Sequence, residues 1–95
     1  MAASITSFSD FSQRLNRAMA DIGRLAAKDS DPMIVSIQRQ LHFVEQWTQG
    51  GQRPAQADLD QLTFGQMASR SVHDVDARLA NELYQLSSYL IVSIP

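Results

Sequence analysis

The feature that most constrains this chain is the recurrence of apolar residues at steps of three and four positions. Such steps place side chains on one face of an α-helix, whereas a half-buried strand alternates every second residue. Three segments carry a long stripe of this kind, and no segment has a convincing strand pattern. The sequence therefore predicts an all-α fold: a compact bundle of four or five helices joined by short connections.

The first two helices are predicted over about residues 8–28 and 32–48. Ser7 or Ser9 can cap the first helix, because a short hydroxyl accepts from an unpaired backbone N–H of the first turn. Asp31 followed by Pro32 is a strong start signal for the second helix, since proline is well suited to the first helical position. The stripes are Phe8, Phe11, Leu15, Ala18, Ile22 and Leu25 in the first helix, and Ile34, Ile37, Leu41 and Val44 in the second.

The third helix is predicted over about residues 57–71, which include the stretch LDQLTFGQMA with Gly65 inside it. A glycine within a helix costs about 1 kcal/mol relative to alanine, so its presence needs a reason. Two alternatives stay open on the pattern alone. Either a short helix over 57–63 ends near Gly65, or the helix continues to residue 71 and Gly65 lets a neighbouring helix approach closely.

The last helix is predicted over about residues 77–92, with Asp76 or Asp74 as its N-cap. Its stripe consists of Leu79, Leu83, Leu86 and Leu90. With 95 residues, of which 44% are hydrophobic and 19% charged, the chain is expected to form one domain over residues 1–95 with a single core.

Composition excludes several classes of function. The chain has no cysteine, so thiol catalysis, zinc–thiolate sites and a disulfide framework are excluded, and a cytoplasmic location is expected. The N-terminus has no signal-peptide pattern, and the terminal apolar stretch YLIVSIP is too short to span a bilayer. The net charge of −2 argues against nucleic-acid binding, and no membrane association is expected.

The sequence contains few residues in a pattern typical of a catalytic site. His42 lies within the second helix without a metal-binding spacing, and we interpret it as a partly buried structural histidine. His73 precedes Asp74 and Asp76, which could indicate a metal or acid–base site, but aspartates at a helix start have a capping role. No serine follows a nucleophile signature. We therefore predict no enzyme, no cofactor and no bound metal.

Charge is distributed unevenly along the chain. Residues 1–53 carry six basic and five acidic side chains, a net +1, whereas residues 54–95 carry two basic and five acidic ones, a net −3. An acidic helical surface can be steered into a basic active-site cleft of another protein. The candidate partner-binding residues are the five acids of this half, together with Trp47 as an aromatic anchor near a helix end: Asp58, Asp60, Asp74, Asp76, Glu82 and Trp47.

Several short motifs, taken in order, resemble a known family. They are QRQLHFVEQW in the second helix, LDQLTFGQMA, the eleven-residue step from Gly65 to Asp76, DARL running towards Tyr84, and the terminal VSIP. Together they are similar to small bacterial type VI secretion immunity proteins, and the similarity covers roughly residues 32–95. It implies that Gly65 serves close packing within the third helix.

The resemblance also implies a function. Such a protein is an all-helical cytoplasmic antidote that binds the toxin domain of one cognate effector and blocks its active site. The toxins paired with the family exhaust purine nucleotides, either as NAD(P)+ glycohydrolases or as (p)ppApp synthetases that pyrophosphorylate adenosine nucleotides. The resemblance transfers no contact residues to this chain, because its polar surface differs from the family pattern.

Two alternatives of other classes stay open. The chain could be a helical adaptor or dimerisation module, and self-association would favour that reading. It could also bind nucleic acid through Arg14, Arg17, Arg24 and Lys28, which the helical pattern places along one face of the first helix with Asp21 between them. The more ordinary interpretation of that row is a solvated face linked by ion pairs with Asp21.

Overall fold

The computed structural model describes residues 5–28 and 31–93 of the chain, and these residues contain no β-strand. The helices are α1 (Phe8–Lys28), α2 (Pro32–Trp47), α3 (Gln56–Asp60), α4 (Phe64–Ser71) and α5 (Ala77–Ser88). A 3-10 turn η1 (Gln49–Gly51) follows α2, and a π-helical turn η2 (Tyr89–Ser93) extends α5. The predicted all-α fold is confirmed.

The two predicted start signals act as expected. The backbone N–H of Asp10 donates to Ser7 Oγ at 3.1 Å, so Ser7 rather than Ser9 caps α1. The N–H of Met33 donates to Asp31 Oδ1 at 2.9 Å, with Pro32 in the first turn of α2. At the other end of α2, Gly50 and Gly51 have φ values of 75° and 82°. These left-handed conformations, which glycine adopts without strain, stop the helix.

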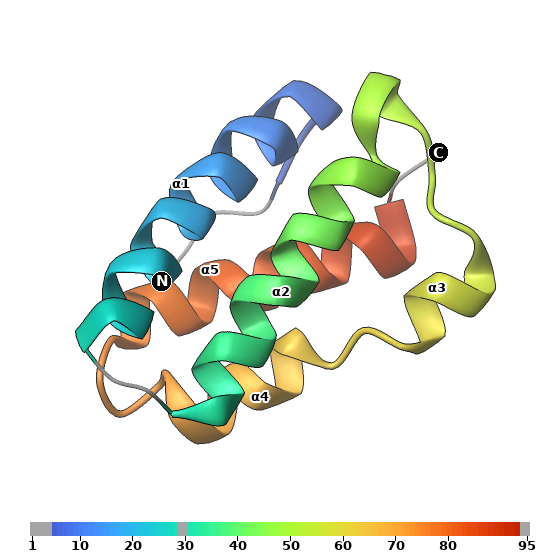
Figure 1. Cartoon of the computed structure of the whole chain (residues 1–95). Helices are drawn as coiled ribbons and strands as arrows, with labels where there is room; N and C mark the ends of the chain where they lie inside the picture. The colour runs from blue at the N-terminus through green and yellow to red at the C-terminus, as the bar shows by residue number, and fades with distance from the viewer. Residues whose placement is uncertain (1–4, 29–30, 94–95) are drawn as a thin grey trace.

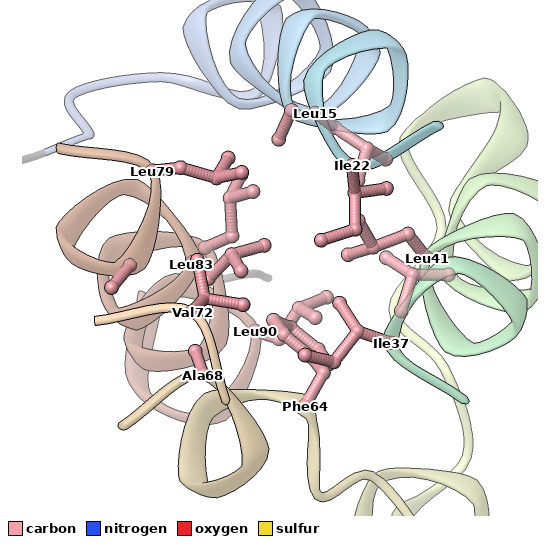
Figure 2. Close-up of a cluster of buried hydrophobic side chains, with 14 of the residues drawn as sticks. Leu15, Ile22, Ile37, Leu41, Phe64, Ala68, Val72, Leu79, Leu83 and Leu90 are labelled. Carbon is pink, nitrogen blue, oxygen red and sulfur yellow. The ribbon is translucent and has the colours of Figure 1, made fainter. Parts of the chain in front are cut away.

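Four helices enclose the core. Figure 1 shows α2 across the front of the molecule, with α1 beside it, α5 behind it and α4 below. α1 packs against α2 and α5, and α4 packs against the same two helices, so the four form a closed ring. The side chains from all four point into one interior in Figure 2. The predicted stripes of α1, α2 and α5 supply most of this core.

The predicted helix over 57–71 is wrong in one respect: it is two helices, α3 and α4, separated by Gln61–Thr63. The reason lies in the direction of its apolar side chains. Leu59 and Ala68 are nine residues apart, so at about 100° per residue a continuous helix would point them to opposite sides. Both are buried, Leu59 at 6% and Ala68 at 0% exposure. The break at 61–63 allows both to face the core.

A side chain from α2 satisfies the backbone at this break. Gln40 Oε1 accepts from the N–H of Thr63 at 2.8 Å, and Gln40 Nε2 lies 3.2 Å from Thr63 Oγ1. Phe64, the next residue, is fully buried at the start of α4. Together, the hydrogen bonds of Gln40 and the burial of Phe64 hold the start of α4 against α2.

Each of the two alternatives for Gly65 that the sequence left open is correct in part. The chain does break here, but before Gly65, which lies in the first turn of α4. A Cβ at this position would lie 3.2 Å from Ser87 Oγ and 3.3 Å from Ser87 Cβ on α5, closer than most such contacts. The absence of a side chain therefore lets α4 approach α5, as the family resemblance implied.

We expect Gly65→Val to lower the free energy of unfolding by about 1–3 kcal/mol, because the added atoms collide with Ser87. Gly23→Val is the matched control, since a Cβ at Gly23 in α1 meets only Gln38 Nε2, at 3.7 Å. Both variants replace a helical glycine by valine, and they differ in what the added atoms meet. Urea unfolding followed by circular dichroism measures the difference, and an equal loss at both positions would contradict this account of Gly65.

Candidate functional site

The structure does not gather the candidate acidic residues into one patch. Asp58 and Asp60 lie on α3, whereas Asp74 and Asp76 lie in the turn between α4 and α5. Figure 1 places α3 and this turn on opposite sides of the molecule. Each pair of neighbouring acids therefore presents its own small surface.

Two of these acids, Asp76 and Glu82, form hydrogen bonds that stabilise the fold. Asp76 Oδ1 accepts from the N–H of Leu79 at 3.0 Å, so Asp76 is the N-cap of α5. Asp74, the other candidate cap, projects into solvent with its side chain 97% exposed. Glu82 on α5 accepts a charge-assisted hydrogen bond from Arg14 Nε on α1.

The pair of Arg14 and Glu82 corrects the prediction that Arg14 belongs to a solvated basic face. The Arg14 side chain is only 11% exposed, and its Nη1 also lies 3.6 Å from Asp10 Oδ2. The hydrogen bond to Glu82 raises the pKa of Arg14 above its ordinary value, and burial opposes this shift. Farther along α1, Arg24 pairs with Asp21. Two of the four cations in the row are thus engaged within the protein, which leaves it poorly suited to track a phosphate backbone.

Trp47 is half-buried at the end of α2 and stacks on Phe43 one turn earlier. The two ring centroids lie 5.6 Å apart with an angle of 12° between the planes. Phe43 itself is 43% exposed, which is high for a large apolar side chain. Trp47 was among the predicted contact residues and Phe43 was not, although a spacing of four residues on a helix brings the two side chains together.

A shallow groove of about 300 Å³ runs along the outer side of α2 next to this aromatic pair. Its lining residues are Val35, Gln38, Arg39, His42, Phe43 and Gln46. His42 is exposed in this groove, so its interpretation as a partly buried structural histidine is wrong. The buried stripe of α2 fills the opposite side of the helix, which leaves His42 on the solvent side.

His73 is exposed, and its Nδ1 lies 3.7 Å from Asp74 Oδ1. Within residues 5–28 and 31–93, no group of three or more His, Cys, Asp or Glu side chains is arranged to hold a metal ion. In the same part of the chain, no helix combines the length and apolar character needed to cross a membrane.

Comparison with known proteins gives one match. The sequence model of a protein family described as Tsi6 matches residues 10–92, which include most of α1 and all of α2, α3, α4 and α5. A search of curated proteins and a search of solved structures return no match.

We expect Glu82→Ala to lower the free energy of unfolding by about 1–2 kcal/mol, because it leaves the largely buried Arg14 side chain without its main partner. Asp60→Ala is the matched control: Asp60 is exposed, and among the described residues it accepts a hydrogen bond only from Gln56 on its own helix. Its effect should stay within about 0.5 kcal/mol. Thermal unfolding of both variants measures the difference, and equal stability would show that the ion pair contributes nothing measurable to the fold.

Proposed function

This chain belongs to the Tsi6 family of type VI secretion immunity proteins, and we propose that it inhibits one cognate effector by covering the active site of its toxin domain. The match to the family over residues 10–92 is the observation that carries this proposal. The inhibitor acts in the cytoplasm of the producing cell, where it protects that cell from its own toxin and from that of its neighbours.

The toxin in this proposal is a nucleotide-targeting enzyme, either an NAD(P)+ glycohydrolase or a (p)ppApp synthetase. The similarity of the sequence motifs to the immunity family supports this class. The acidic second half of the chain is consistent with it, because enzymes that bind phosphorylated nucleotides line their clefts with arginine and lysine. Carboxylates of the inhibitor would meet such side chains favourably.

The working part of the protein in this proposal is its surface, not a reactive group. The described helices enclose an apolar core and leave no orphaned buried side-chain polar atom that would need a ligand. A folded inhibitor of this kind binds without a large reorganisation, so little binding free energy is lost in ordering it.

We expect co-production of this protein to restore growth to cells that make the toxin domain of the effector encoded beside its gene. The pools of NAD(P)+ and ATP in the cells without inhibitor identify the toxin: NAD(P)+ falls with a glycohydrolase, whereas ATP is converted to (p)ppApp by a synthetase. The purified toxin domain should lose activity when the inhibitor is added in equimolar amount. Binding without inhibition would contradict the proposal and favour a helical adaptor.

Among the acidic residues proposed as toxin contacts, Asp58 and Asp60 offer the sharpest test of steering. They lie two positions apart on the short helix α3, where Asp60 is exposed and Asp58 half-buried. Reversal of both charges in Asp58→Lys/Asp60→Lys should slow association with the toxin about tenfold at low salt, and less at high salt. Stopped-flow kinetics at several salt concentrations measures this. An unchanged association rate would remove these two residues from the interface and leave the inhibitor proposal intact.

A further inference from the structure

The outer side of α2 brings apolar, aromatic and charged side chains together around a groove. We call this surface the α2 face, and it consists of Val35, Gln38, Arg39, His42, Phe43, Gln46 and Trp47. Figure 1 shows α2 across the front of the molecule, with the other core helices beside it and behind it. The core takes Ile34, Ile37, Leu41 and Val44 from the opposite side of the helix.

Two large apolar members of the α2 face are exposed to solvent. Val35 is 38% and Phe43 43% exposed, and they lie eight residues apart on the same side of the helix. The core does not need them, because the inner stripe of α2 is fully buried without them. Exposed apolar side chains that the fold does not use mark binding surfaces when they gather beside polar ones.

The stacked rings of Phe43 and Trp47 make this surface rigid. Each ring restricts the rotation of the other at a centroid distance of 5.6 Å, and both side chains rise from a regular helix. Aromatic side chains held in this way lose little entropy when a partner covers them. Phenylalanine, tryptophan and arginine are all enriched in protein interfaces, and tryptophan and arginine are among the residues that most often dominate the binding energy.

Arg39 provides the polar element of the groove. It is the one permanently charged residue among the six that line the groove. It is exposed and forms no ion pair within residues 5–28 and 31–93. A guanidinium beside an apolar groove favours a partner that brings a carboxylate next to an apolar side chain.

The charge of the groove also distinguishes between occupants. In a twofold contact between two copies of this chain centred on the groove, the two Arg39 side chains would approach each other. Like charges brought together in this way oppose association. A different protein with a carboxylate at this position meets no such repulsion, and the family assignment supplies that protein as the cognate toxin.

We propose that the α2 face docks on the toxin, and that the toxin segment it accepts carries an apolar side chain next to an aspartate or glutamate. Phe43 and Val35 contact the apolar side chain, Trp47 supports Phe43, and Arg39 pairs with the carboxylate. This inference rests on the proposed inhibition of a toxin and adds to it the contact surface and the chemistry of the partner. The groove volume of about 300 Å³ suits one or two inserted side chains and is at the lower limit for a cofactor.

Two pairs of variants test the surface, with the purified toxin domain of the neighbouring effector gene as the probe. Phe43→Ala is matched by Val75→Ala, because Val75 is 61% exposed in the turn between α4 and α5. Arg39→Glu is matched by Arg78→Glu, which changes the net charge equally at an exposed position of α5. Circular dichroism melts confirm that all four variants fold, as their exposed positions lead us to expect.

Phe43→Ala and Arg39→Glu should each weaken toxin binding at least about tenfold by isothermal titration calorimetry, and each control should stay within about twofold. Equal affinities within either pair would overturn the assignment of the α2 face. If the wild-type protein and these variants all bind the toxin and protect the cell equally well, only the assignment of the α2 face is wrong. If the wild-type protein neither binds nor protects, the proposed function itself fails.

Photo-crosslinking tests the chemistry of the partner. A benzoylphenylalanine at position 43, irradiated in the complex with the toxin domain, marks the segment that covers the groove. Mass spectrometry should identify a toxin peptide in which an apolar residue neighbours an aspartate or glutamate. A crosslink to a second copy of this chain, or to a toxin peptide without a carboxylate, would overturn the proposal. Replacing that carboxylate by lysine in the toxin should restore binding of Arg39→Glu, and a failure to do so would also count against it.

Discussion

The approach of α4 to α5 is the contact on which the rest of this structure depends. α4 has only eight residues and no side-chain N-cap, so isolated it would not be stable. It is held because Phe64 enters the core completely and Gly65 lets the helix backbone come close to Ser87. With α4 in place, α2 is supported on one side by α1 and on another by α4. The outer face of α2 is then free to contact another molecule, since α1 and α4 both contact this helix from its core side.

The sequence predicted the fold wherever one apolar stripe runs along one helix. In α1, α2 and α5 with its extension η2 the stripe residues are buried, apart from Phe8 and Leu25 at the two ends of the α1 stripe, which pack against the core while partly exposed. Steps of three and four keep these side chains on one face of a helix, which a strand could not do. In the third predicted helix the same reasoning failed. One continuous helix over 57–71 was predicted, although a regular helix turns Leu59 and Ala68 apart by half a rotation. Phe64, a large apolar residue between them, indicated two short helices, because Leu59, Phe64 and Ala68 can all reach the core only if the chain bends.

The candidate site was less predictable, and the reason is physical. Whether a charged side chain is free or engaged depends on what the fold places opposite it. Glu82 meets Arg14, 68 positions earlier in the chain, and no local pattern contains that contact. Exposure has the same origin: Phe43 and Phe64 are the same residue type, yet one is 43% exposed and the other fully buried. The pattern did hold a usable hint, because Val35, Arg39 and Phe43 recur every four residues on the side of α2 that its core stripe does not use.

This separation of the two sides of α2 bears on how an immunity protein with the proposed α2 docking surface can change its specificity. The inner stripe fixes the position of the helix, and its replacement would cost stability through lost packing. The outer residues contact solvent, so their replacement changes the binding surface while the core stays as it is. An immunity protein and its toxin can thus diverge at Val35, Arg39 and Phe43 without a new fold. In the proposed docking through the α2 face, specificity would arise from a few side chains on a rigid helix, and a cation of a foreign toxin opposite Arg39 would oppose binding.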